Sequence, residues 1–210
     1  MMTNDHELWP MIHVGRAALA ADLTGLDEAG WATPSLCAGL TVREVLAHLT
    51  VSATLGPVRW FVGVLRCRFD FDRQVAMRLA EQLGSSSEET LARFRAAVDS
   101  TTSPPLPRRA LLGEVIVHAT DIRRPLGIEH RHPVETLTTV ARYYVGSDQT
   151  VLARGRVRGL RLAATDGPFA AGDGPSVSGP TLALIMAMTG RRACCADLTG
   201  EGVPILAERC

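Results

Sequence analysis

The chain has 210 residues, and 46% of them are apolar, which suffices for a buried core and is unlike a disordered protein. Its 22 basic and 22 acidic residues give zero net charge, which argues against a general nucleic-acid binder because such a protein needs a basic excess to neutralise phosphates. Every basic residue is an arginine, so no lysine is available as a Schiff-base nucleophile or general base.

The N-terminal segment, residues 1–16, has charges and a proline where a signal peptide needs an unbroken apolar core. The best apolar stretch, Leu182 to Met188, is far too short to span a membrane. We therefore expect a cytoplasmic protein that binds neither membrane nor nucleic acid, with its oligomeric state left open. The five cysteines have irregular spacings and no CxxC pair, so we expect buried thiols rather than a disulfide framework or a zinc ribbon.

The first predicted element is an amphipathic helix over residues 6–27. Its apolar side chains are spaced by four and seven residues, so they share one stripe of the helix. They are Leu8, Ile12, Leu19 and Leu23. Pro34 and Gly39 then predict a loop over residues 32–40.

A second helix is predicted to begin at a definite residue. Thr41 and Glu44 form the T-x-x-E pattern of a capping box, in which each side chain bonds to the other's backbone N–H. The helix runs from there toward Pro57 and carries His48 among apolar residues.

Further helices follow at shorter intervals. Residues 58–83 are helical in pattern but less regular, and Ser87 with two glutamates predicts the start of a short helix. The prolines of residues 100–107 predict a loop, after which helices are expected over 108–124 and about 133–150. This succession of helices and short loops predicts a bundle.

The pattern changes near residue 155. Residues 158–166 alternate as a strand does, and glycine-rich turns beyond them predict a hairpin or small meander. A last helix, apolar on all sides and therefore buried, is expected between Pro180 and Gly190. The expected fold is mainly α: a helical bundle over residues 1–152, followed by a small C-terminal α/β domain over residues 153–210.

One helix carries a polar stripe that needs an explanation. Glu114 and His118 are four residues apart in the predicted helix over 108–124, so they lie on one face, about 6 Å apart along the axis. Asp121 continues this face one turn further. A buried carboxylate and imidazole are costly unless they are paired or bind a cation.

His48 is the best candidate for a third ligand because it lies in the middle of an apolar helix of the bundle. Two histidine nitrogens and one carboxylate oxygen would leave a zinc ion with open positions, as in catalytic sites. Asp121 would then orient His118 from outside the ligand set. By spacing alone an ordinary surface pair of Glu114 and His118, with His48 as a core histidine, remains the better-supported alternative.

Longer segments around these residues resemble the mycothiol-dependent maleylpyruvate isomerase family, part of the DinB/YfiT-like superfamily of metal-binding four-helix bundles. The similar segments are SLCAGLTVREVLAHL (35–49), GEVIVHATD (113–121), GLRLAATDG (159–167), SGPTLALIMAMTGR (178–191) and ADLTGEG (196–202). The resemblance implies a DinB-like bundle followed by the family's small α/β domain. It places the family's zinc ligands on His48, Glu114 and His118.

The resemblance also implies a reaction. Zinc would keep the sulfur of mycothiol as a thiolate at neutral pH, ready to attack a small electrophile. In an isomerase the thiol would add to an activated double bond, allow rotation and leave; in an S-transferase it would stay. A non-catalytic module that holds a metal or small ligand on the same fold is the alternative.

Two arginines follow the polar stripe. Arg123 and Arg124 lie one to two turns beyond His118, where either would meet a carboxylate of the substrate or of the thiol. We assign Asp121 and Arg123 as candidate catalytic residues and Arg124 as a candidate contact for the thiol cosubstrate. Arginines that complement the negative end of the helix are an equally good interpretation.

Overall fold

The computed structural model describes residues 8–210, except for the side chains of residues 71 and 72. The chain forms two compact units, the first ending at Glu129 and the second comprising His130–Cys210. His6 and the start of the first predicted helix lie outside the described residues.

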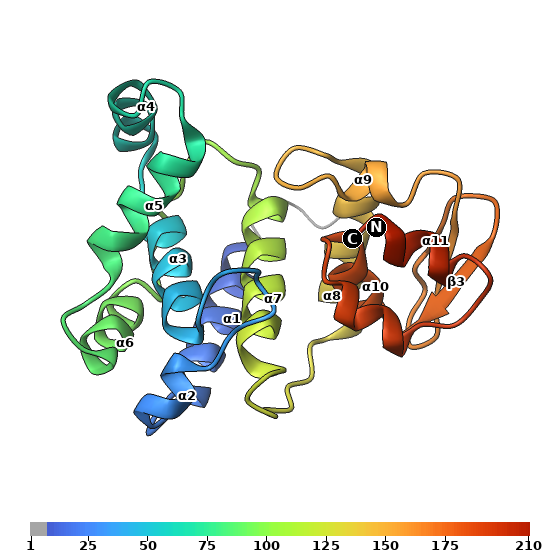
Figure 1. Cartoon of the computed structure of the whole chain (residues 1–210), viewed down its shortest axis with the longest axis horizontal. Coiled ribbons are helices and arrows are strands. Elements are labelled where there is room, and N and C mark those ends of the chain that lie inside the picture. The colour runs from blue at the N-terminus through green and yellow to red at the C-terminus, as the bar shows by residue number, and fades with distance from the viewer. Residues whose placement is uncertain (1–7) are drawn as a thin grey trace. The chain divides into compact units, whose positions relative to one another are not determined.

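The described part of the first unit is helical, and its helices follow one another in the order drawn in blue to yellow-green in Figure 1. They are α1 (Leu8–Asp22), α2 (Glu28–Ala32), α3 (Val42–Thr54), α4 (Pro57–Arg66), α5 (Phe71–Gln82), α6 (Ser87–Ala96) and α7 (Arg108–Arg123).

α7 lies between two other helices of the bundle. α7 packs against both α1 and α3, and α3 also packs against α5 and α6. The apolar stripe predicted for α1 lies in the core, with Leu8, Ile12, Leu19 and Leu23 fully buried. α7 is buried on nearly all sides, so its polar side chains that face α1 or α3 lie in an apolar environment.

The start of α3 confirms the predicted capping box. The Thr41 backbone N–H donates to Glu44 Oε2 at 2.7 Å, and the Glu44 N–H donates to Thr41 Oγ1 at 3.3 Å. These bonds satisfy backbone donors that the first turn leaves without partners. The position of His48 along the bundle is therefore fixed from the start of its own helix.

The less regular helical segment predicted over residues 58–83 consists of two helices, α4 and α5. Its break lies between α4 and α5, where Arg68 and Phe69 have φ values of 54° and 65°. Residues with side chains rarely adopt this left-handed conformation, and helix-period patterns do not reveal it.

The second unit combines helices with a small sheet. Its elements are α8 (Val134–Gly146), α9 (Ala153–Arg156), β1 (Arg161–Ala164), β2 (Ala170–Ala171), β3 (Ser176–Gly179), α10 (Thr181–Met188), a 3₁₀ helix (Arg192–Asp197) and α11 (Val203–Glu208). The strand order is β2-β1-β3, with β1 antiparallel to β2 and parallel to β3. The predicted hairpin is present as β1 and β2. The alternation of apolar and polar residues does not predict that β3 pairs with β1 in parallel.

α10 forms the centre of this unit. It is buried from Ala183 to Met188, as its apolar sequence predicts, and it packs against α8. The predicted boundary after residue 152 places α8 with the bundle, whereas the compact units place it with the C-terminal part because of this packing. The prediction of a mainly α fold with a small α/β part is confirmed.

No single helix among the described residues is long and apolar enough to cross a membrane. α3 and α4 meet the length and composition only when taken together, and a bend of 118° separates them.

Candidate metal centre

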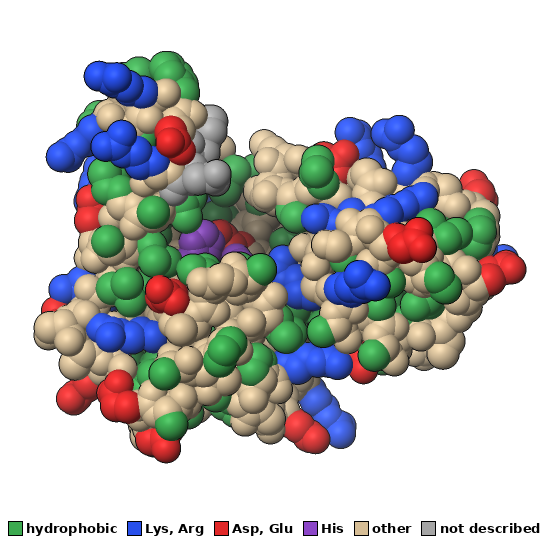
Figure 2. All heavy atoms as spheres, viewed as in Figure 1, with side chains coloured by type: hydrophobic (Ala, Val, Ile, Leu, Met, Phe, Trp, Pro, Cys, Tyr) green, Lys and Arg blue, Asp and Glu red, His purple; other side chains and the backbone are tan. Residues whose placement is uncertain are grey.

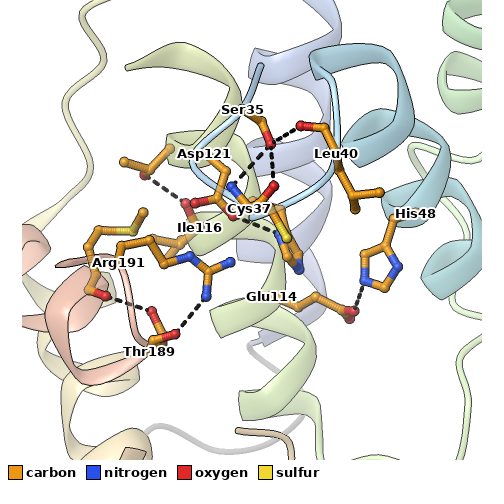
Figure 3. Close-up of polar contacts among 12 residues, drawn as sticks. Ser35, Cys37, Leu40, His48, Glu114, Ile116, Asp121, Thr189 and Arg191 are labelled. Atoms are coloured by element: carbon orange, nitrogen blue, oxygen red, sulfur yellow. Dashed lines mark hydrogen bonds and ion pairs between the residues drawn. The ribbon is translucent and has the colours of Figure 1, made fainter. Parts of the chain in front are cut away.

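α3 and α7 bring the three predicted ligands together. His48, Glu114 and His118 each offer one ligand atom, and these atoms all lie within 4.8 Å of one another. Figure 3 shows His48 on α3 and Glu114 on α7 pointing toward each other across the space between the two helices. The pairing of residues 66 positions apart depends on helix packing, so spacing in the sequence gives no direct indication of it.

The separation of the donors fits a metal ion. His48 Nε2 and Glu114 Oε1 are 3.1 Å apart. Two ligands that bind zinc at about 2.0–2.2 Å with tetrahedral angles are themselves roughly 3.3–3.5 Å apart. A small adjustment of either side chain therefore accommodates a zinc ion, and the donor set of two imidazoles and one carboxylate suits that metal.

Asp121 orients the second histidine of the site. Its Oδ2 lies 2.9 Å from His118 Nδ1, and its side chain is fully buried. This contact occupies Nδ1 and leaves Nε2 of the ring for a ligand. Histidines that bind metals commonly have such a carboxylate partner, which fixes the ring and its tautomer.

Ser52 is a member of the site that sequence analysis missed. It lies one turn after His48 on the same face of α3, and its hydroxyl donates to Glu114 Oε1 at 2.8 Å. The spacing of His48 and Ser52 indicates that they share a face of the helix, because residues four apart do so. A serine in a helix is too common, however, to stand out without the packed partner.

The electrostatics of the site favour a charged carboxylate and a neutral imidazole. Burial raises the pKa of Glu114, but hydrogen bonds from His48 and Ser52 and the charges of the histidines outweigh burial, so the pKa lies below its ordinary value. Burial is also the largest influence on His118, and it lowers the pKa of this imidazole despite the opposing contact with Asp121. These are the protonation states that a metal ion requires of its ligands.

A second missed residue contributes positive charge from α1. Arg16 is 1% exposed, and its guanidinium donates to the Ser100 carbonyl at 2.9 Å. It interacts electrostatically with Glu114, while burial lowers the pKa of Arg16 itself. Arg16 falls on the apolar stripe of α1 between Ile12 and Leu19, and a charge in that position is the sequence signal for a buried role.

The ligands are accessible from outside. The side chains of His48, Glu114 and His118 are 25%, 21% and 15% exposed. Figure 2 shows histidine side chains, in purple, that reach the surface beside hydrophobic ones. A metal ion held here would keep contact with small molecules, as a catalytic site needs.

A second grouping overlaps the first. Cys37, His118 and Asp121 also bring their ligand atoms within 4.8 Å of one another. Because His118 Nδ1 is already engaged by Asp121, this grouping serves better as support for His118 than as a separate cation site.

The two predicted arginines have different surroundings. Arg123 is 3% exposed, and its Nε donates to Asp22 Oδ2 of α1 at 2.7 Å. The pair joins the end of α7 to the end of α1, and burial lowers the pKa of Arg123 although Asp22 opposes this. Arg124 is exposed at the end of α7. The structure thus brings Asp121 to the three ligands and places Arg123 in an ion pair.

Comparison with known proteins finds one matching family model. Residues 12–105 match the family model described as the mycothiol maleylpyruvate isomerase N-terminal domain. The predicted resemblance is confirmed. The matched region includes His48 and Ser52 and ends before α7, so the other two candidate ligands lie beyond it. No curated protein matches the chain.

Two solved structures are similar to the chain in fold. One is described as the mycothiol-dependent maleylpyruvate isomerase, with 20% sequence identity and a TM-score of 0.58, covering 94% of this chain and 93% of that one. The other is a variant of that enzyme in which a histidine is replaced by alanine, with 19% identity, a TM-score of 0.57 and the same coverage. At these identities the likeness establishes the fold alone, and it agrees with the mainly α fold that the sequence predicts.

Proposed function

We propose that the chain is a zinc-dependent enzyme that uses a low-molecular-weight thiol such as mycothiol, as an isomerase or an S-transferase acting on a small electrophile. The observation that carries the proposal is the convergence of the ligand atoms of His48, Glu114 and His118 within 4.8 Å of one another. The match of residues 12–105 to the mycothiol maleylpyruvate isomerase N-terminal domain supports a thiol as the cosubstrate. The proposal includes the cytoplasmic location expected from the sequence.

The charge of the donor set supports a thiolate partner. Zinc bound here would act as a Lewis acid that keeps a thiol deprotonated at neutral pH. His48 and His118 as neutral imidazoles and Glu114 as a carboxylate supply one negative charge in total. A divalent cation in this set therefore retains net positive charge, which favours an anionic sulfur over a neutral ligand at an open position.

Asp121 and Arg16 support the ligands in different ways in this proposal. Asp121 holds the His118 ring, and the positive charge of Arg16 interacts with Glu114. We keep Arg124, exposed at the end of α7, as the candidate contact for a carboxylate of the thiol or substrate. Arg123 fixes the last turn of α7 through Asp22 and thereby the helix that carries His118.

Elemental analysis of the purified protein tests the metal. We expect about one zinc per chain in the unmodified protein and loss of the metal in H48A and in H118A, because each variant removes one of three protein ligands. Stoichiometric zinc in both variants would rule out this site.

Turnover assays with mycothiol and small electrophiles test the reaction. A thiol whose concentration stays constant while product forms identifies an isomerase, and a thiol consumed one for one with the electrophile identifies an S-transferase. Binding of mycothiol without any turnover would instead favour a non-catalytic binding module and overturn the proposal of an enzyme.

A further inference from the structure

We infer that Ser52 is a positioning residue of this site, which holds the Glu114 carboxylate in place when a metal ion is bound. The inference rests on the proposed metal centre and deepens it. Ser52 is buried on α3, with an exposed fraction of 8%, and its Oγ lies 2.8 Å from Glu114 Oε1 on α7. A hydroxyl on one helix thus contacts a candidate ligand on another.

The direction of the Ser52 proton follows from the distances. The hydroxyl has two acceptors within reach, Glu114 Oε1 at 2.8 Å and the His48 carbonyl at 3.4 Å. One hydroxyl has one proton, and a bond to an ionised carboxylate is shorter and about twice as strong as one to a neutral oxygen. Ser52 therefore donates to Glu114, and its contact with its own helix is secondary.

The hydrogen bonds of Glu114 change when a metal binds. In this structure Oε1 lies within hydrogen-bond distance of both Ser52 Oγ and His48 Nε2, the latter at 3.1 Å. A histidine nitrogen that ligates a metal ion must give up its proton, so it can no longer donate. The bond from His48 is then lost, and the bond from Ser52 persists.

The persistence of this one bond gives Ser52 its role. A glutamate has three rotatable side-chain bonds, and without a fixed partner its carboxylate samples several orientations, of which few suit a ligand shell. Ser52 restricts that motion from the opposite helix. Asp121 does the same for His118 from within α7, so two of the three ligands have a supporting group that metal binding does not displace.

Metal affinity and the cobalt absorption spectrum test the role. For S52A we expect zinc affinity to fall 10- to 100-fold, the usual effect of removing a group that supports a ligand. The Co²⁺ spectrum should also change, since it reports the geometry of the ligands. S52T keeps the hydroxyl and should restore both. T54A is the matched control: Thr54 lies on the same helix and its hydroxyl donates to the Thr50 carbonyl, so its removal should leave affinity and spectrum unchanged.

A double-mutant cycle with E114Q shows whether Ser52 acts through Glu114. We expect S52A to weaken zinc binding much less in the E114Q background than in the unmodified protein. Unchanged affinity and spectrum in S52A, or an equal effect of S52A in both backgrounds, would overturn the inference while leaving the metal centre intact. Failure of the unmodified protein to bind zinc or cobalt would overturn both.

Discussion

Two buried side chains in the candidate site hydrogen-bond to candidate metal ligands and fix their orientation. Asp121 is fully buried, yet its carboxylate has a specific task because it lies 2.9 Å from His118 Nδ1. A buried carboxylate without such a contact would be strongly destabilising. The same logic applies to Ser52, whose hydroxyl is directed at Glu114.

We expect D121N to weaken zinc binding about 10- to 100-fold with little change in helix content. The amide keeps the size of the carboxylate but no longer provides a charged acceptor, so the tautomer and orientation of His118 are less well fixed. Zinc affinity, measured by competition with a chelator, checks this. D148N, which alters a carboxylate of the second unit that pairs with Arg154, serves as the control, and equal affinities in the two variants would count against the role of Asp121.

The ion pair of Arg123 and Asp22 should contribute to stability more than to chemistry. Arg123 is nearly fully buried and Asp22 is only partly exposed, so R123M leaves a carboxylate without its charge partner. We expect a loss of roughly 1–3 kcal/mol in the free energy of unfolding, with zinc stoichiometry retained. Urea titrations of R123M, D22N and the double variant measure the coupling, and a double variant as unstable as the sum of the two singles would show that the pair contributes nothing.

Cys195 should be unreactive in the folded protein. Burial, followed by the neighbouring Cys210 thiol, raises the pKa of Cys195 to about 12. Because the thiolate is the reactive form and a raised pKa reduces its population below that pH, roughly one molecule in 10,000 carries it at pH 8. Iodoacetamide at pH 8 should therefore label Cys195 only after denaturation. Mass spectrometry of the two samples checks this, and rapid labelling of folded protein at Cys195 would contradict it.

At the scale of secondary-structure elements, the ends of helices decide where site residues lie. α3 begins at a complete capping box, and one further turn along the helix brings His48 to face α7. A substitution that weakens the capping box should therefore affect the site by destabilising the first turn of α3, without changing a ligand.

We expect T41A to lower the free energy of unfolding by about 1 kcal/mol, since the variant loses the side-chain acceptor for the Glu44 N–H. For a chain of this size that corresponds to about 2–4 °C in the midpoint of thermal unfolding. T41S keeps the hydroxyl and should unfold close to the unmodified protein. A T41A midpoint equal to that of T41S would show that the box contributes little.

The sequence specifies the features that depend on local chemistry, whereas several features that depend on packing cannot be found in it. The box at Thr41 and the stripe of Glu114 and His118 can be found because each lies within a few residues. Ser52 and Arg16 escaped, because their roles depend on helices that contact only in the folded chain. The break at Arg68 and Phe69 escaped because left-handed backbone at residues with side chains leaves no periodic signal.

At the scale of the whole molecule, the candidate ligands all belong to one of the two compact units. His48 lies on α3 and both Glu114 and His118 on α7, whereas β1–β3 and α10 belong to the other unit. A metal ion bound by these residues would therefore stabilise the packing of α3 against α7 directly. Since only the folded form presents all three ligands, a zinc concentration 100 times the dissociation constant adds about 2.7 kcal/mol to the stability of the state that binds.

Amide hydrogen exchange with and without zinc shows where that stabilisation acts. We expect zinc to slow exchange in α1, α3 and α7, because α7 packs against the other two and local opening there separates the ligands. Exchange in β1–β3 should change little, since those strands belong to the second unit and carry none of the ligands. H118A provides the control, because zinc should have no effect on its exchange. Uniform slowing across both units, or slowing that persists in H118A, would place the metal elsewhere than on α3 and α7.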